Sequence, residues 1–262
     1  MRTRLAAILV LFVAAAAEAQ TFRYRAAATP ATGTVFHYTK SNRDGTDAWR
    51  LSAFVLSPTR IEVIKYLEGE VDFVVVEAEQ DWQRFAPMHL RQWNVFADET
   101  AFRIAAHPSR DGKALVAKLA NGGSMSFPAG AVPLHIYGFD FMGLNFALPH
   151  LVSAERSFEL DLIDFNRDAL VARAKAEYVG REQLRGADCA KYRLTGPFFG
   201  EKKGWLWVSL AARRLERFEH ELPTSTDWND VLVELQSVET MDDFQWQALK
   251  DAVTAKLKTR RK

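Results

Sequence analysis

Cysteine is nearly absent from this 262-residue chain, which contains a single one, Cys189. One cysteine excludes an intramolecular disulfide and any metal site built from several thiolates. Net charge is also close to zero, because 34 Lys and Arg residues stand against 33 Asp and Glu residues. The chain therefore lacks the basic surplus that is typical of nucleic-acid binders, and we expect no nucleic-acid partner.

Motifs that carry nucleotide or nucleophile chemistry are absent as well. The sequence contains no G-x-x-x-x-G-K-[ST] loop, no G-x-G-x-x-G loop and no G-x-S-x-G elbow. Cys189 has two readings, a reactive thiol or a small buried hydrophobe, and its strand-like neighbours favour the buried one. We therefore expect no cofactor, and the sequence leans away from an enzyme.

A secretory signal is the clearest feature that is present. Arg2 and Arg4 form a short basic region, and an uninterrupted apolar run follows from Leu5 to Ala17. Ala17-Glu18-Ala19 is an A-x-A cleavage site, so residues 1–19 have the three-part layout of a signal peptide. The alternative is a membrane anchor, but the run is shorter than the roughly 20 residues that span a bilayer.

The rest of the chain holds no run long enough to span a membrane. The longest apolar region, 131–151, is interrupted by prolines, by histidines and by Asp140. The sequence thus predicts an exported protein, either periplasmic in a bacterium or secreted, with no transmembrane segment in its mature chain.

Alternation of apolar and polar residues dominates from residue 33 onward and predicts strands. The twelve candidate segments are 33–41, 49–55, 61–66, 71–78, 100–106, 114–119, 158–162, 176–179, 187–195, 204–210, 215–222 and 231–238. Asn42-Arg43-Asp44-Gly45 separates the first two, and Asp-Gly is a strong hairpin signal. Short connections between successive strands predict antiparallel pairing.

A mainly β fold follows from this pattern. Open sheets of more than about ten strands tend to curl or split, so we expect a large curved antiparallel sheet, a half-barrel or partly open barrel. Residues 20–262 are expected to form one domain. A C-terminal helix is predicted at about 242–257, with Asp242 as N-cap, and a basic tail follows it. A helical or loop plug is expected to cover the concave face.

The segment from Pro133 to His150 is the strongest candidate site. It is rich in aromatic residues and glycine, fits neither strand nor helix periodicity well, and places a few polar groups among apolar ones. Ligand pockets have this composition, since apolar walls dominate and a few polar groups set orientation. The predicted ligand-binding residues are His135, Tyr137, Phe139, Asp140, Phe141, Leu144 and Phe146. The alternative is that the segment fills the concave face as a plug, with Asp140 and Asn145 capping turns.

Two histidines and a carboxylate in this segment also raise the question of a metal. His135, Asp140 and His150 are suitable ligand types for zinc or for a two-His, one-carboxylate site. Their spacing matches no short metal motif, so we predict no metal site. An enzyme built on these three residues would require their side chains to converge on one pocket.

The layout resembles bacterial periplasmic proteins of the LolA/LolB-like, lipoprotein-carrier fold and related periplasmic families. The resemblance lies in the opening hairpin around Asn42-Arg43-Asp44-Gly45, and in the closing strand Gly204-Trp205-Leu206-Trp207-Val208, which leads to residues 214–221. It covers most of the mature chain at the level of pattern. The family's strand carries an acidic residue after the Trp, and this chain has Val208-Ser209 there. The resemblance implies a curved sheet wrapped over a helical plug and an apolar cavity, but no functional residue.

The sequence therefore predicts an exported, non-catalytic envelope protein that binds a hydrophobic ligand, a lipid or an acyl chain, in the concave face of its sheet. The alternative is an envelope scaffold that captures a protein partner by an exposed strand edge or by the basic tail. A hydrolase or metal-dependent enzyme is the third hypothesis.

Overall fold

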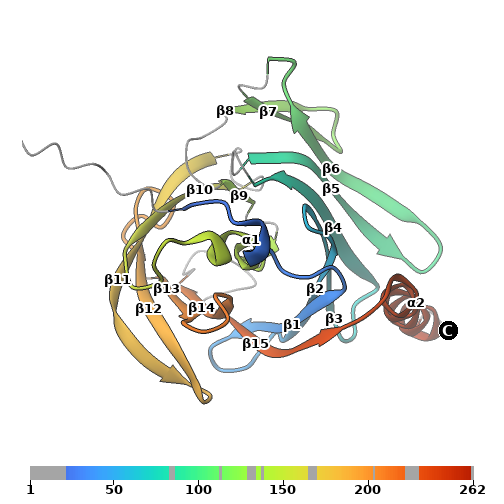
Figure 1. The fold of residues 1–262 in the computed structure, drawn as a ribbon. Helices are drawn as coiled ribbons and strands as arrows, with labels where there is room; N and C mark the ends of the chain where they lie inside the picture. The colour runs from blue at the N-terminus through green and yellow to red at the C-terminus, as the bar shows by residue number, and fades with distance from the viewer. Residues whose placement is uncertain are drawn as a thin grey trace, which may run out of the picture.

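The computed structural model describes residues 22–82, 86–111, 114–128, 134–136, 139–164, 170–202, 204–221 and 230–260. Fifteen strands within these ranges form one continuous sheet (Figure 1). They are β1 (Thr34–Asn42), β2 (Trp49–Ser57), β3 (Arg60–Leu67), β4 (Asp72–Asp81), β5 (Ala86–Phe96), β6 (Thr100–Pro108), β7 (Ala114–Leu119), β8 (Ser124–Pro128), β9 (Leu134–Ile136), β10 (Phe158–Asp164), β11 (Leu170–Leu184), β12 (Ala187–Thr195), β13 (Gly204–Ser209), β14 (Leu215–Glu221) and β15 (Asp230–Thr240). The helical elements are η1 (Ala26–Ala28), α1 (Leu144–Ala147), η3 (Leu148–His150) and α2 (Asp243–Arg260).

The strand order shows how this sheet is assembled. It runs β8-β7-β6-β5-β4-β3-β2-β1-β15-β14-β13-β12-β11-β10-β9, so the first strand of the chain pairs with the last. Every described neighbour pair is antiparallel except β9 with β10. The sheet curls round until β8 and β9 lie at its two edges without pairing, as expected for a strongly twisted sheet of this size. The predicted open, curved antiparallel sheet is confirmed.

The concave face of the sheet encloses the main hydrophobic core. Inward side chains alternate along each strand, as Phe36 and Tyr38 do on β1. α1 and η3 lie inside the curve, surrounded by strands (Figure 1), and all their residues are buried. A short helix thus occupies the segment whose periodicity fits neither helix nor strand.

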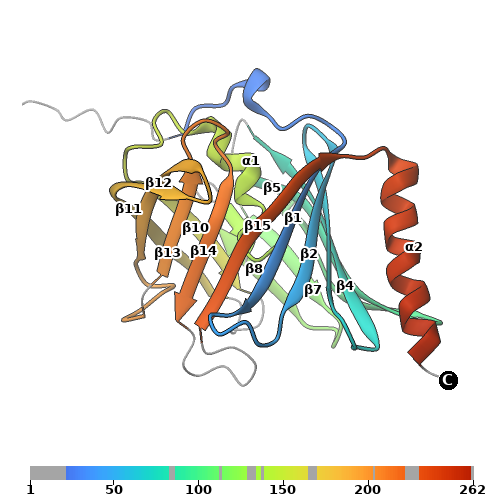
Figure 2. The same ribbon diagram turned by 90° about the horizontal axis from the view of Figure 1, so that it is seen from below.

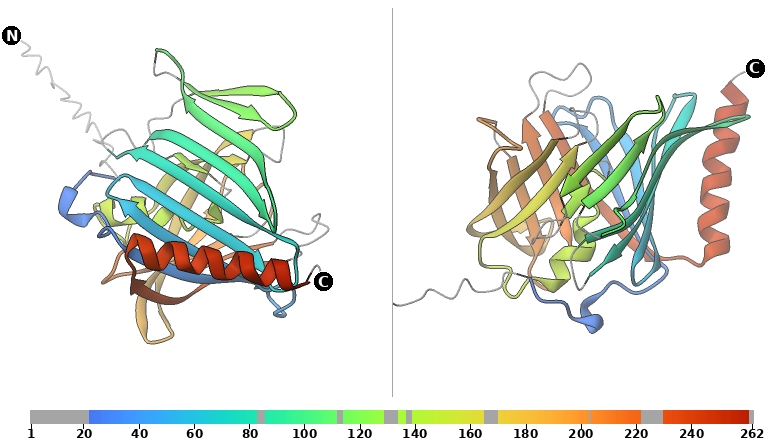
Figure 3. Two further views of the ribbon diagram at one scale, coloured as in Figure 1. Left: turned by 90° about the vertical axis from the view of Figure 1, so that its right-hand side faces the viewer. Right: turned by 90° about the horizontal axis from the view of Figure 1, so that it is seen from above.

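A second, smaller core lies between the convex face and α2. The helix stands alongside the strands on the outside of the sheet (Figures 2 and 3). Its predicted apolar stripe is observed: Trp246, Val253 and Leu257 are buried, and Leu249 packs against them. Trp246 stacks on Phe54 with ring centroids 4.9 Å apart. Among the described helices, none combines the length and apolarity needed to cross a membrane.

The start of α2 confirms the predicted N-cap. Asp242 Oδ1 accepts a hydrogen bond from the Gln245 backbone N–H at 2.8 Å, and Gln245 Oε1 accepts one from the Asp242 N–H at 2.9 Å. This reciprocal pair is a capping box, which satisfies two N–H groups that the helix itself leaves without partners.

Three strands of the sheet were not predicted, and β5 is the most instructive of them. Gln92 and Asn94 of β5 pair with Val76 and Val74 of β4, which face the main core. Residues that pair directly across two strands share a face of the sheet, so Gln92 and Asn94 also face the concave side. Asn94 accepts a hydrogen bond from Arg103 Nη1 at 3.3 Å. Polar residues on the inward face hide the apolar alternation on which strand prediction depends. β8 and β9 are short edge strands with little pattern to detect.

Candidate functional site

Five of the seven predicted ligand-binding residues lie on the plug, which we define as residues 139–151 inside the curved sheet, and His135 lies on β9. Phe139, Phe141, Leu144 and Phe146 are each at most 2% exposed and belong to the main core. Tyr137 lies outside the described residues. The apolar part of the predicted site is therefore gathered on the concave face.

Two aromatic side chains of the plug stack on aromatic residues outside it, one on β14 and one just after β4. Phe141 stacks on Phe218 of β14 with centroids 4.0 Å apart, and Phe146 stacks on Trp82 with centroids 5.5 Å apart. Stacked and edge-on pairs at such distances stabilise beyond the area they bury. These contacts show that the segment fills the interior, whereas its role in lining a ligand remains a prediction.

A buried charge cluster stands in the middle of this apolar interior. Asp140 accepts hydrogen bonds from the ammonium groups of Lys40 on β1 and Lys65 on β3, each at 2.7 Å. The three side chains are only 6%, 14% and 13% exposed, respectively. Such charge-assisted bonds are stronger than neutral ones, and inside a protein little solvent screens them.

The electrostatics of the cluster follow from burial and from these two contacts. Burial by itself would raise the pKa of Asp140, but the two lysines outweigh it and bring that pKa down to about 2. Burial lowers the pKa of Lys65, and the carboxylate of Asp140 opposes this shift. Asp140 is therefore ionised at neutral pH, and its carboxylate opposes the effect of burial on Lys65.

The backbone of the plug is strained at this point. Asp140 and Phe141 have φ angles of +49° and +67°, the left-handed region that side chains with a Cβ rarely adopt. Such residues cost about 1–3 kcal/mol each and persist where the surroundings over-determine them. Here the two lysines fix the carboxylate, and Phe218 holds the ring of Phe141.

His135 of β9 is close enough to Asp140 for the two to interact electrostatically. It is buried, its ring is 5.1 Å from that of Phe141, and its Nε2 has no hydrogen-bond partner among the described residues. Burial lowers the pKa of His135 to about 3, although the nearby Asp140 opposes the shift. The ring is neutral at pH 7. It packs closely on Gly143, where a Cβ would come within 3.1 Å of it.

His150 occupies a different place. Its ring packs against Tyr24 and Trp82, with centroids 5.2 and 5.7 Å away, and its Nδ1 accepts a bond from the Arg25 N–H at 3.3 Å. In the part of the chain that the structure describes, no three His, Cys, Asp or Glu side chains are grouped so that they could hold a metal ion. His135, Asp140 and His150 are therefore not grouped as the ligands of a metal ion.

Asn145 connects the plug to both neighbouring walls. Its Nδ2 donates to Tyr38 Oη at 2.8 Å, and its Oδ1 accepts from the Leu215 N–H at 2.8 Å. Tyr38 Oη in turn donates to the Leu215 carbonyl at 2.8 Å, so the buried amide and phenol are satisfied together. Asn145 thus bridges β1 and β14 across the interior, where the sequence suggested a turn cap.

Sequence reasoning overlooked Lys40 and Lys65, although a signal for both exists. Lys40 continues the inward series Phe36 and Tyr38, and Lys65 continues the inward series that contains Val63. A lysine in phase with core residues is a charge on the buried face of a strand, and a buried charge requires a partner. That partner, Asp140, lies 75 residues or more away in sequence.

No family model matches this chain, and no curated protein matches it. Solved structures do match. A beta-barrel-like protein of the domain of unknown function DUF1849 from Brucella abortus is 8% identical, with a TM-score of 0.43 over 80% of this chain and 98% of its own. A DUF1329 family protein from Desulfovibrio piger is 10% identical, with a TM-score of 0.25 over 84% and 90%.

A LolA superfamily protein from Nitrosomonas europaea is 11% identical, with a TM-score of 0.20 over 80% of this chain and 85% of its own. The superfamily that the sequence resembles is thus among the similar structures. Because these TM-scores are all below 0.5, no function is carried over from those proteins to this chain.

Proposed function

We propose that this protein is exported to the cell envelope and, without catalysing a reaction, binds an apolar molecule with an anionic head group inside its curved sheet. The signal peptide at residues 1–19 supports export. The concave apolar face supports an apolar ligand, a lipid or an acyl chain, because burial of apolar area contributes roughly 25 cal/mol per Å².

The pair of lysines that faces into this apolar interior carries the proposal. Two ammonium groups, from Lys40 and Lys65, converge on one carboxylate at 2.7 Å. A fatty-acid carboxylate or a lipid phosphate offers the same acceptor oxygens as Asp140, so it could share or replace that partner. A few placed charges in an apolar setting are what orients a ligand in most small-molecule sites.

The proposed ligand contacts are the seven residues predicted from the sequence. Phe139, Phe141, Leu144 and Phe146 would contact the apolar part of the ligand, together with Tyr137. His135 would contact its head group, and Asp140 would share Lys40 and Lys65 with that head group.

Native mass spectrometry with lipid extraction, on protein purified from the envelope of its own host, tests this proposal. We expect a stoichiometric apolar molecule that carries a carboxylate or phosphate. Lys65→Met leaves Asp140 paired with Lys40 and should reduce the bound fraction severalfold. Lys118→Met, which changes an exposed lysine of β7, is the matched control and should retain the ligand. A clean apo mass, with no uptake of an added fluorescent fatty acid, would overturn the proposal.

The sheet edges support a second candidate, an envelope scaffold. β8 and β9 end the described sheet, and their outer backbone groups face no further strand in it. Such an edge can accept a strand from a partner. Replacing Ser126 of β8 by Pro would block one such edge, and capture of a partner that survives this change would argue against β8 as the docking strand.

A further inference from the structure

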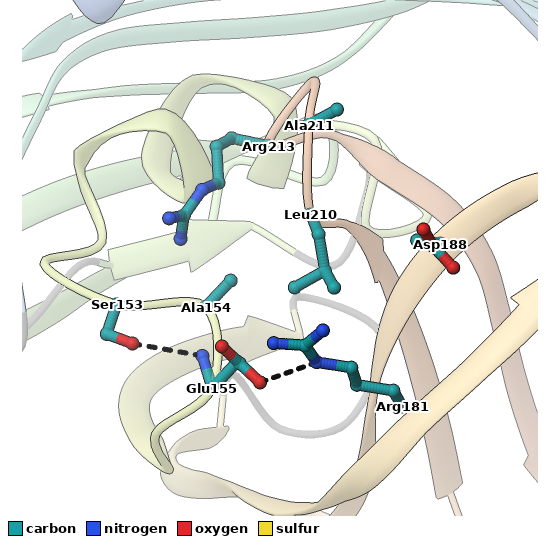
Figure 4. Close-up of a pocket in the computed structure, with 8 residues that line it drawn as sticks. All are labelled: Ser153, Ala154, Glu155, Arg181, Asp188, Leu210, Ala211 and Arg213. Carbon is teal, nitrogen blue, oxygen red and sulfur yellow. Dashed lines mark hydrogen bonds and ion pairs between the residues drawn. The ribbon is translucent and has the colours of Figure 1, made fainter.

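A pocket of about 420 Å³ opens at one end of the curved sheet, apart from the charge cluster around Asp140. Three segments distant in sequence form it (Figure 4): the loop after η3, the ends of β11 and β12, and the turn between β13 and β14. Its volume falls within the range of about 300–1,000 Å³ that is typical of small-molecule sites. Nothing in the proposed function uses this pocket.

Charged side chains dominate its lining. Glu155 comes from the loop, Arg181 from β11, and Asp188 from β12, while Leu210 and Arg213 come from the turn. Arg181 Nε is 2.7 Å from Glu155 Oε1, so these two groups neutralise each other across the pocket (Figure 4). Asp188 is engaged by the amide of Gln183.

Arg213 is the remaining cation of the lining, and its Nη1 is buried. That nitrogen has no hydrogen-bond partner in the residues that the structure describes. A buried charged donor without an acceptor is costly, so native proteins nearly always provide a partner. The guanidinium of Arg213 lies above the loop that carries Ser153 and Ala154 (Figure 4).

The backbone at Arg213 has a conformation that is unusual for a residue with a side chain. Its φ is +52°, a conformation that glycine adopts at no steric cost and that arginine adopts with strain. The turn is nevertheless well fixed, because Ser209 bonds the backbone of Ala212, Arg213 and Arg214, and the Leu210 N–H donates to the Asp188 carbonyl at 2.8 Å. The turn thus fixes the backbone from which the Arg213 side chain extends, which reduces the entropic cost of binding.

We propose that this pocket binds a small polar molecule through an oxyanion, a carboxylate or a phosphate, that accepts hydrogen bonds from Arg213. Arginine is well suited to either group, because its planar fork matches their paired oxygens. The Arg181–Glu155 pair and Asp188 provide donors and acceptors for the polar remainder of the molecule, and Leu210 provides an apolar contact. The ligand is thus distinct in chemistry from the apolar molecule proposed for the interior.

Isothermal titration calorimetry with sodium succinate and with inorganic phosphate, at ionic strength matched by NaCl, tests this site. We expect one molecule of at least one probe to bind per chain. Binding of succinate alone identifies a carboxylate ligand, and binding of phosphate alone identifies a phosphate ligand. If neither probe binds the purified protein at about 10 mM, a concentration at which sites near a millimolar Kd are largely filled, the proposal is wrong.

Three variants assign the binding to Arg213. Arg213→Gln should weaken it at least tenfold. Arg193→Gln, which changes an exposed arginine of β12 that pairs with Glu177, is the matched control and should bind like the unchanged protein. Ala211→Trp places a large ring at the exposed rim and should also abolish binding, and it covers the case in which Arg213→Gln does not fold. Unchanged affinity in Arg213→Gln would overturn the role of Arg213.

Discussion

Replacing Asp140 by asparagine should destabilise the protein strongly. The change removes the charge that two lysine ammonium groups contact at 2.7 Å and keeps the side-chain volume. All three side chains are at least 86% buried, since Lys40, the most exposed, is at 14%. Removing one partner from such a buried pair costs about 3–5 kcal/mol, because the remaining charge is left in a poorly solvated place.

This cost can be converted into a shift of the unfolding midpoint. Chains of 150–250 residues lose about 2–4 °C in Tm per kcal/mol, so Asp140→Asn should lower Tm by about 6–20 °C at pH 7, followed by circular dichroism. Glu159→Gln is the control, because this exposed carboxylate pairs with an exposed arginine, Arg173. Exposed pairs contribute about 0–1 kcal/mol, so its Tm should hardly move.

The pH dependence of the same variant tests the cause. Burial already lowers the pKa of Lys65 below its ordinary value, and loss of the carboxylate lowers it further. Between the pKa of Lys65 in the variant and its higher pKa in the unchanged protein, the folded variant binds fewer protons than the folded unchanged protein, so the stability of the variant rises more steeply with pH. The deficit of Asp140→Asn should therefore shrink between pH 7 and pH 10. A deficit under about 1 kcal/mol at pH 7, or one that is unchanged at pH 10, would refute the assignment of a buried ion cluster.

Three further predictions follow from other buried groups. Burial lowers the pKa of His135 to about 3, so the folded state resists protonation of this ring. The free energy of unfolding should therefore fall by about 1.4 kcal/mol for each pH unit below 6.5. Urea unfolding at pH 7 and pH 5 measures this fall, which should be smaller in His135→Phe. Cys189 is fully buried and its pKa is raised to about 12, chiefly by burial, so iodoacetamide should label it only after unfolding, and rapid native labelling would contradict the structure. Trp246 stacks on Phe54, and its indole N–H donates a hydrogen bond to Glu62 at 2.5 Å. Trp246→Ala should therefore destabilise the protein by about 3–5 kcal/mol, and a protease should cleave α2 before the sheet unfolds. Simultaneous digestion of α2 and the sheet would show instead that the sheet depends on α2.

Much of this architecture can be predicted from local sequence, because its signals are local. Period-two alternation marks a strand wherever one face is buried, and Asp44-Gly45 closes the first hairpin, with Gly45 at φ +86°. α2 follows from the 3.6-residue spacing of Trp246, Leu249 and Val253 behind the N-cap Asp242. The signal fails where the inward face is polar, as along β5.

The candidate sites depend on contacts that sequence distance conceals. Composition alone marked the aromatic segment around Phe141 as unusual and identified His135 and Asp140 as polar residues within it. It left open whether that segment is a plug, a ligand lining or both, and the structure shows the plug.

The chain by itself determined a curved antiparallel sheet with an outer helix, since hydrophobic periodicity and turn residues act over a few positions. Only the tertiary structure brought Asp140 to Lys40 and Lys65, across 100 and 75 residues, and Arg213 to Glu155. The sequence could not predict these contacts because a charged residue leaves no periodic pattern that would identify its partner. Where a charge finds its partner is decided by strand register and by the path of the plug through the interior.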